Sequence, residues 1–362
     1  MVSHPCVVPV NQSVYVRLAE LGWDPVVVVP DRWRHEYSPE AFAPRPLPGM
    51  EDRLMPLRIV LPGRPQRHFY LARPAHVVRR LRPRAVFLHE ETFSVPALQW
   101  GLTIRRMGIP FGVQAYENLD RPLPWPARLI RRAVLARADF VAARSPAAGE
   151  LARRWGAVGD VVLAPEGIPD WERPLRRPAG PYTIGFAGRL VPEKGIGDLV
   201  EAVRLLEGPV RLLLVGDGPL RAELEGTTLP NGTLEIRTGV SHESMAEVYA
   251  EINALVLPSR TTPRWAEQFG RVLAEALWCG VPIVGSDSGE IPWVIDATRG
   301  GRLFPEGDVH ALSQTLRELR ADPVGSEALA RQGREAVKRL FSVSAAAEAL
   351  DEALLAALAR RT

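Results

Sequence analysis

Short apolar runs recur along the whole chain and alternate with longer segments of helical patterning. The run at 26–29 is valine at every position, as expected for a strand that is covered on both faces. Strands that alternate with helices favour parallel sheets wrapped by helices. The pattern therefore predicts an α/β fold built from doubly wound, Rossmann-like sheets. We expect strands at 26–29, 58–61, 85–88, 111–115, 140–143, 161–164, 183–186, 212–215, 234–237, 254–257 and 283–284.

The chain has 362 residues, of which 46% are hydrophobic, and this is enough for two cores of ordinary size. The segment 167–181 is rich in proline, arginine and glycine and has the composition of an interdomain linker. We expect one domain over 1–172, a second over 173–343 and a C-terminal helix over 344–362. The first helix is expected near Ser13, so the first strand is either very short or the chain begins late.

Cysteine use and hydropathy exclude several protein classes. Cys6 and Cys279 are far apart and form neither a disulfide framework nor a Cys-x-x-Cys metal motif, which favours a reducing, cytoplasmic compartment. We expect no membrane span and no signal peptide, because no apolar run approaches the roughly 18 residues that a span needs.

Positive charge is concentrated in the first half. Residues 1–175 contain 24 arginines, no lysine and 17 acidic residues, a charge of +7, so the total of +3 leaves −4 for the remainder. Such a half can lie against an anionic membrane surface or accept a phosphorylated substrate. Alternatively, arginine is simply abundant, and the arginines at 79–84 and 128–132 are solvated helix faces. We expect no nucleic-acid partner, because no recognition motif accompanies the arginines.

Polar and glycine-rich loops follow the strands of the second half, at the sheet edge where α/β proteins bind ligands. The loop from Gly188 to Gly195 carries Arg189 and Lys194, and two fixed cations suit a diphosphate. Gly216 and Gly218 come next, in a turn that lets a backbone approach a ligand closely but is also a common tight turn. Main-chain groups at Gly239 and Val240 follow the next strand and could meet a flat base edge.

Two acids, Glu267 and Glu275, flank the turn at Phe269 and Gly270 and precede an apolar helix. A carboxylate accepts paired hydrogen bonds from vicinal hydroxyls, and N–H groups at a helix start bind phosphates. Glu267 could instead serve only the helix dipole. An unpaired Glu275 among apolar neighbours would be costly, so a binding role is favoured. The pair could act as acid and base, but the basic loop favours hydroxyl-binding clamps on a diphosphate donor.

These motifs resemble those of the retaining GT-B glycosyltransferases of family 4. The resemblance rests on the Glu-x7-Glu motif from Glu267 to Glu275, the Gly-Arg-Leu…Glu-Lys-Gly loop from Gly188, and the Gly-x-Gly-Pro turn from Gly216. It is specific from about 145 to 341 and includes Ser145-Pro146-Ala147, Pro165-Glu166-Gly167-Ile168 and Pro258-Ser259, although Glu166 replaces the usual asparagine.

The resemblance implies two Rossmann-like domains facing each other across a cleft, with the acceptor bound by 1–172 and a nucleotide-sugar by 173–343. It further implies that Arg189 and Lys194 hold the diphosphate, Glu275 the ribose and Glu267 the transferred sugar. We expect neither a cofactor nor a metal ion, since the two cations replace one and no Asp-x-Asp motif occurs. The insert 261–265 is expected to shape the donor pocket. The remaining donor-side candidates are Gly188, Gly216, Gly218, Gly239, Val240, Gln268, Phe269, Gly270 and Arg271.

The first half resembles the family only in outline. Asn11 and Gln12 occupy the place of a glycine-rich loop, and Tyr116 and Glu117 occupy the place of a catalytic-site histidine. We expect Tyr116 and Glu117 to face the donor as catalytic candidates. On the acceptor side we also expect Asn11 and Gln12, together with His89 and Glu90. Such polar residues after strands are also common helix caps.

The implied function is transfer of a hexose-type sugar, with retention, from an NDP-sugar to a glycan, lipid-linked or secondary-metabolite acceptor. One alternative is a non-catalytic nucleotide-sugar-binding partner of another transferase, which would also match weakly in its first half. A sugar-phosphate synthase or an NDP-sugar epimerase also stays open. A nicotinamide-dependent oxidoreductase is disfavoured, because no Gly-x-Gly-x-x-Gly follows either first strand.

Overall fold

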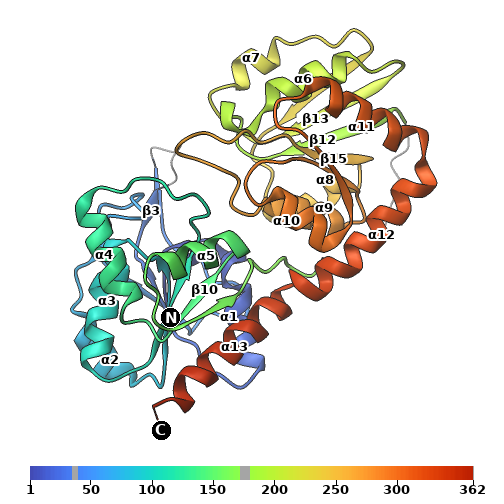
Figure 1. Cartoon of the computed structure of the whole chain (residues 1–362). Coiled ribbons are helices and arrows are strands. Elements are labelled where there is room, and N and C mark those ends of the chain that lie inside the picture. The colour runs from blue at the N-terminus through green and yellow to red at the C-terminus, as the bar shows by residue number, and fades with distance from the viewer. Residues whose placement is uncertain (35–39, 172–179, 362) are drawn as a thin grey trace. The chain divides into compact units, whose positions relative to one another are not determined.

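The computed structural model describes residues 1–34, 40–171 and 180–361, and the chain divides into two compact units (Figure 1). The first unit contains Met1–Pro169 and Val343–Thr362, and the second contains Asp170–Ser342. The chain therefore returns to its first unit at Val343. The expected boundary between 172 and 173, and most of the linker expected at 167–181, lie outside the described residues.

The first unit is built on a seven-stranded sheet in the order β11-β10-β9-β8-β1-β2-β5, in which every neighbouring pair is parallel. The first strand is very short: it spans two residues, and Val2 lies opposite Val28 on one side and Leu88 on the other. The strands are β1 (Val2–Ser3), β2 (Val27–Pro30), β5 (Leu54–Leu57), β8 (Val86–Glu91), β9 (Phe111–Ala115), β10 (Phe140–Ala143) and β11 (Asp160–Leu163).

A short strand does lie within the range expected at 58–61, but it is not part of the parallel sheet. The third strand on this side of the sheet is β5, and Ile59–Val60 (β6) instead pairs antiparallel with Phe69–Tyr70 (β7). β5 is an edge strand with half-exposed residues, so it tolerates Pro56, which interrupts its apolar residues. A second small antiparallel pair joins Trp33–Arg34 (β3) to Ala41–Phe42 (β4).

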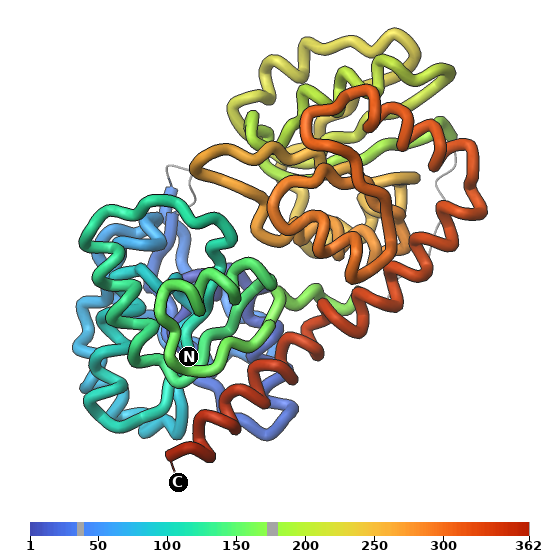
Figure 2. Tube along the Cα trace, viewed as in Figure 1, coloured from blue at the N-terminus to red at the C-terminus, as the bar shows by residue number. Residues whose placement is uncertain are grey.

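The last helix of the chain is part of the first unit. It packs against α1 and crosses β9, β10 and β11 (Figures 1 and 2). The Nε1 of Trp23 donates to Oδ1 of Asp351 at 2.6 Å. Helix α3 packs on β8 and β9, with α2 and α4 beside it. The helices are η1 (Pro5–Val7), η2 (Pro9–Gln12), α1 (Ser13–Glu20), α2 (Pro74–Leu81), α3 (Val95–Arg106), α4 (Trp125–Leu135), α5 (Pro146–Arg154) and α13 (Val343–Ala359).

The second unit has a parallel six-stranded sheet in the order β14-β13-β12-β15-β16-β17. Five of its strands match the expected runs, whereas β17 was not expected because two of its four residues are exposed. The two doubly wound sheets confirm the α/β class. The strands are β12 (Tyr182–Ala187), β13 (Val210–Val215), β14 (Gly232–Arg237), β15 (Ala254–Leu257), β16 (Ile283–Ser286) and β17 (Gly301–Phe304).

Helices α6 and α11 of the second unit pack against each other, and α12 packs against both α9 and α10. Within the described residues, no helix of either unit is long and apolar enough to cross a membrane. The helices of this unit are η3 (Pro192–Lys194), α6 (Ile196–Arg204), α7 (Arg221–Glu225), η4 (His242–Ser244), α8 (Met245–Tyr249), α9 (Arg271–Trp278), α10 (Ile291–Thr298), α11 (Val309–Ala321) and α12 (Pro323–Leu340).

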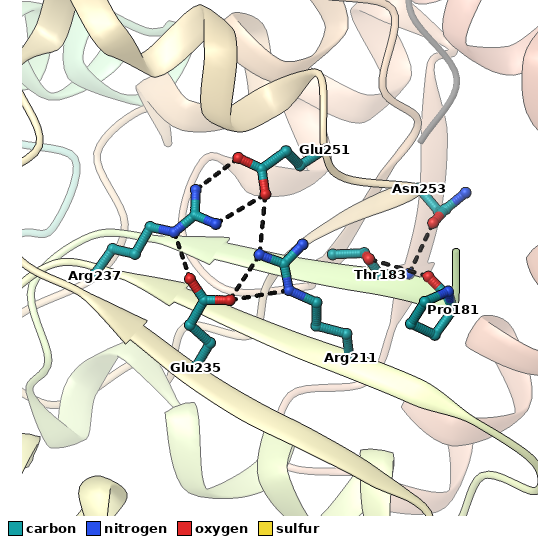
Figure 3. Close-up of polar contacts among 7 residues, drawn as sticks. All are labelled: Pro181, Thr183, Arg211, Glu235, Arg237, Glu251 and Asn253. Atoms are coloured by element: carbon teal, nitrogen blue, oxygen red, sulfur yellow. Dashed lines mark hydrogen bonds and ion pairs between the residues drawn. The ribbon is translucent and has the colours of Figure 1, made fainter. Parts of the chain in front are cut away.

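A network of ion pairs joins the edge strand β14 of the second sheet to its neighbours. Arg237 on β14 binds both oxygens of Glu251, at 2.6 and 2.8 Å, and also contacts Glu235 (Figure 3). Arg211 on β13 reaches Glu235 and Glu251 at 2.7 and 2.9 Å. Because each charge has two partners, this network fixes β14, whose residues are mostly half-exposed, to β13 and to Glu251, the second residue after α8.

Candidate donor and acceptor sites

Glu267 and Lys194 meet at the carboxyl ends of the adjacent strands β12 and β15. The Nζ of Lys194 lies 2.5 Å from Oε2 of Glu267, and the Ser259 hydroxyl donates to the same oxygen at 2.8 Å. The Nζ also lies 5.2 Å from the centre of the Trp265 ring, within the insert 261–265. Glu267 is only 8% exposed. The structure therefore joins the basic loop and the first acid of the Glu-x7-Glu motif into one charged cluster.

Glu275 lies on α9 with 3% of its surface exposed, and three side chains contact its carboxylate. Nε of Arg271 and Nε2 of His242 lie 2.9 and 3.0 Å from Oε1, and the Tyr249 hydroxyl donates to Oε2 at 2.8 Å. Burial alone would raise the pKa of Glu275. The hydrogen bond from His242 and the charge of Arg271 outweigh it, so the pKa is held below the ordinary carboxyl value. The buried acid is thus a stable carboxylate, partnered as its apolar surroundings require.

Helix α9 begins at Arg271, immediately after the turn between the two acids. Gly270 caps it in the left-handed conformation, with φ of 68°. The Phe269 ring is buried and packs edge-on against Phe341 at 5.1 Å, so its side chain belongs to the core. Apart from the half-exposed Gln268 and the Arg271 side chain that contacts Glu275, the 268–271 segment offers a ligand its main chain and the start of a helix, which favours anions.

The glycines of the neighbouring loops let the loops approach each other. A Cβ on Gly216 would lie 1.8 Å from the carbonyl oxygen of Gly188, so the loops after β13 and β12 touch backbone to backbone. A Cβ on Gly195 would lie 1.9 Å from the Pro258 carbonyl oxygen, and Gly195 has φ of 65°. The sequence analysis predicted that glycines in these turns let the backbone approach a ligand. In the structure, their small size lets the neighbouring loops pack against each other.

Arg189 is exposed on the loop after β12, and Gly239 and Val240 follow β14 at the open edge of the same sheet. Two hydrogen bonds hold the Arg189 loop in place: the Leu190 amide donates to the Asp217 carbonyl, and the Leu220 amide donates to the Leu190 carbonyl. These backbone hydrogen bonds therefore fix the loop that carries Arg189.

The two acceptor-side candidates on β8 lie inside the strand, which was expected to end at residue 88 but continues to Glu91. Nδ1 of His89 lies 2.9 Å from the Tyr15 hydroxyl and 3.2 Å from Oγ of Ser3. Burial, and the positive charge of Arg144, lower the pKa of His89 to about 3. His89 is therefore a neutral, structural imidazole and too weak a base for proton transfer at neutral pH.

Tyr116 and Glu117 follow β9, as expected. The Arg144 guanidinium lies 4.3 Å above the Tyr116 ring, and burial raises the pKa of Tyr116 well above its usual range. Both oxygens of Glu117 accept hydrogen bonds from Arg121, at 2.6 and 2.8 Å. Tyr116 is thus a phenol that stays protonated, and Glu117 is fixed in a bidentate ion pair.

Asn11 and Gln12 lie in η2 and hold loops of the first unit together. The Asn11 amide donates to the Pro5 carbonyl at 2.8 Å. The fully buried Gln12 amide donates to the carbonyls of Cys6 and Arg45 and accepts from the Leu47 amide. The expectation that Gln12 faces an acceptor was wrong, because its polar atoms are turned inward to satisfy buried backbone groups.

His242 and Tyr249 complete the environment of Glu275, and sequence reasoning missed both. They lie in η4 and α8, more than 25 residues before Glu275. What pointed to such partners in the sequence was Glu275 itself, because a buried carboxylate requires hydrogen-bond donors from elsewhere in the fold. Nothing in the local sequence identifies which donors these are.

Two family models match this chain. The model for glycosyl transferases group 1 matches residues 167–339, and the model for the glycosyl transferase 4-like domain matches residues 7–167. A GDP-mannose-dependent alpha-mannosyltransferase of Mycobacterium tuberculosis is 33% identical over 169 residues, covering 46% of this chain and 42% of that protein. A 2-deoxystreptamine N-acetyl-D-glucosaminyltransferase of Streptomyces fradiae is 27% identical over 277 residues, covering 67% and 64%.

The chain thus spans less than two thirds of the length of these curated relatives. Its fold is also similar to solved structures. Anabaena Alr3699/HepE in complex with UDP-glucose superposes with a TM-score of 0.71 at 17% identity, covering 98% of both chains. Sucrose-phosphate synthase from Thermosynechococcus elongatus superposes with a TM-score of 0.70 at 20% identity, covering 96% and 92%. The fold is GT-B, and the two halves of the chain match the models for glycosyl transferases group 1 and for the glycosyl transferase 4-like domain.

Proposed function

We propose that this chain transfers a hexose-type sugar from a nucleoside-diphosphate sugar to a hydroxyl acceptor, with retention of the anomeric configuration. The observation that carries the proposal is the charged cluster of Glu267 and Lys194 beside the start of α9, with the Glu275 carboxylate, paired with Arg271, one turn into that helix. The two family-model matches support transfer chemistry, and structural neighbours solved with UDP and UDP-glucose support a nucleotide-sugar donor.

Lys194 and Arg189 neutralise the leaving diphosphate in this mechanism, and the start of α9 adds main-chain donors. The diphosphate itself accepts the proton of the attacking hydroxyl, so the protein contributes orientation and charge. Glu267 binds a hydroxyl of the transferred sugar. A carboxylate offers about four acceptor positions, and three donors already contact Glu275, so Glu275 accepts one ribose hydroxyl rather than a pair.

The transfer step in this proposal uses no metal ion, because Lys194 and Arg189 supply the positive charge. Turnover without added Mg²⁺ or Mn²⁺ is therefore expected to equal turnover with either ion. A strict requirement for added Mg²⁺ would contradict this assignment.

The acceptor belongs to one of three classes: a glycan, a lipid-linked sugar or a small secondary metabolite. The names of the relatives include transfer to 2-deoxystreptamine and steps of lipopolysaccharide core biosynthesis, so the family name alone does not choose among them. Tyr116, with its protonated phenol, is our candidate to orient the acceptor from the first unit.

A panel of UDP-, GDP-, ADP- and TDP-sugars, screened by thermal shift and then by release of nucleoside diphosphate, tests the proposal. We expect one donor to raise the melting temperature of the protein. We also expect this donor to be hydrolysed slowly, with release of nucleoside diphosphate, when water is the only acceptor. NMR of the product should show the donor's anomeric configuration. Donor binding without any turnover, with acceptors of all three classes present, would favour the non-catalytic partner instead.

We further propose that the enzyme works in the cytoplasm, peripheral to the inner face of the membrane, and that α4 makes the contact. Trp125 and Leu129 are 67% and 57% exposed and lie one turn apart, with the exposed Arg128 and Arg132 on the same face. Binding to anionic vesicles should fall with added salt and with Trp125→Ala. The exposed Val324→Ala on α12 is the matched control, and salt-independent binding would contradict the proposal.

A further inference from the structure

Three side chains from separate segments of the first unit converge beside the central strands. His4 follows β1, Glu90 lies on the neighbouring β8, and His68 directly precedes β7. Nδ1 of His4 lies 2.6 Å from Oε2 of Glu90, and Nε2 of His68 lies 3.9 Å from Oε1. One ligand atom from each residue lies within 4.8 Å of the other two.

The protonation of His68 follows from its neighbours. Its Nδ1 lies 3.2 and 3.1 Å from the carbonyl oxygens of Arg64 and Pro65, and a carbonyl can only accept. Nδ1 therefore carries the proton, and Nε2 presents its lone pair. His68 is fully buried, and among the described residues Nε2 has no hydrogen-bond partner although it is directed at Glu90.

Such a lone pair, facing a fully buried carboxylate, is costly in an apolar environment unless an electrophile lies between them. A hydrogen-bonded pair of His4 and Glu90 explains the 2.6 Å contact but leaves Nε2 of His68 without a partner. A divalent cation satisfies all three groups at once. The carbonyl contacts of Nδ1 orient His68 in the way that outer-shell groups orient metal-binding histidines.

Two imidazole nitrogens and one carboxylate form a donor set that suits Zn²⁺ and its neighbours in the first transition row, whereas Mg²⁺ and Ca²⁺ prefer all-oxygen sites. The Trp33 ring lies 5.0 Å from the His4 ring and 5.2 Å from the His68 ring and forms a wall of the cluster. The His4 side chain is 16% exposed, so an ion can reach the cluster from solvent.

We propose that His4, His68 and Glu90 bind one divalent transition-metal ion of the zinc class. The ion ties the end of β1 and the end of β8 to the segment that carries His68, and this fixes the carboxyl edge of the first sheet. All three ligands belong to the first unit, so the proposal is independent of sugar transfer and of the donor cluster around Lys194.

The test uses the full chain without a histidine tag, stripped with a chelator and titrated with ZnCl₂ in a calorimeter. We expect one equivalent to bind, a rise in Tm on binding, and visible absorption bands of the tetrahedral type when CoCl₂ replaces zinc. His68→Gln and Glu90→Gln should each weaken zinc binding by at least ~10-fold. His76→Gln, an exposed histidine on α2, should bind as the wild type does.

His4→Gln is the third variant, because its side chain is partly exposed and the change disturbs folding least; it should weaken binding to a similar degree. The proposal is overturned if the wild type binds no stoichiometric zinc, or if a folded His4→Gln variant binds zinc as tightly as the wild type. Equal affinity for MgCl₂ and ZnCl₂ would also overturn it, because the nitrogen donors would then have no role.

Discussion

Removal of the Glu275 carboxylate should destabilise the second unit before it affects any chemistry. In Glu275→Ala, Arg271 loses its anionic partner at 2.9 Å, and the buried Tyr249 hydroxyl loses its acceptor. Breaking a buried ion pair by removing one partner costs about 3–5 kcal/mol. We therefore expect the free energy of unfolding of the second unit to fall by about that amount. In Glu275→Gln the loss should be smaller, because the amide oxygen still accepts from Tyr249.

The same carboxylate makes stability depend on pH in a defined direction. The pKa of Glu275 in the folded chain lies below the ordinary value of 4.5. Its contribution is therefore complete above pH 4.5 and is lost as the pH falls through the lower, folded value. Glu275→Gln lacks this contribution, so the acid-induced fall in its stability should be shallower than that of the wild type.

Urea unfolding at pH 7 and at several pH values below 4.5, followed by circular dichroism, measures both effects. Glu201→Ala is the matched control, since Glu201 pairs with Arg204 on the surface of α6 with its side chain 55% exposed. A surface pair is worth about 0–1 kcal/mol, so the control should change little. A loss in Glu275→Ala no larger than in Glu201→Ala would refute the reasoning.

Three further substitutions have defined outcomes. Lys194→Ala should abolish nucleoside-diphosphate release while circular dichroism stays unchanged; full turnover would remove Lys194 from the mechanism. Gly195→Ala places a Cβ 1.9 Å from a carbonyl oxygen at φ of 65°, so it should lower the urea midpoint more than the nearby Gly197→Ala, which has open space. Arg237→Ala should cost about 1 kcal/mol or less, and added salt should shrink that cost; a salt-independent loss would argue for packing instead.

The sequence patterns predicted the fold well where strands are buried on both faces. The apolar runs at 111–115, 140–143 and 254–257 coincide with strands β9, β10 and β15. The patterns missed two edge strands, β5 and β17, whereas the edge strands β11 and β14 were expected. Pro56 interrupts the apolar residues of β5, which are mostly half-exposed, and β17 has two exposed positions. Continuous apolar runs indicate strands that are buried on both faces, and these two edge strands are only partly buried.

The candidate site was predictable only where its residues are close in sequence. The Glu267/Glu275 spacing and the basic loop were visible, and the cost of an unpaired Glu275 implied buried partners. Those partners, His242 and Tyr249, come from η4 and α8, and local sequence does not encode that these elements bring them to Glu275. Likewise, the sequence gives no sign that His68 lies near Glu90. His68 directly precedes β7, which pairs with β6 outside the main sheet.

Donor turnover compared between the wild type and Glu267→Gln tests the central claim most directly. Glu267→Gln keeps the shape of the side chain but removes the charge that contacts Lys194. With the donor selected from the thermal-shift panel, we predict that the wild type releases nucleoside diphosphate and transfers sugar with retention. Folded Glu267→Gln should still bind the donor but lose at least ~10² of the rate. Wild-type rates in that variant, or no binding of any nucleotide-sugar by the wild type, would contradict the account.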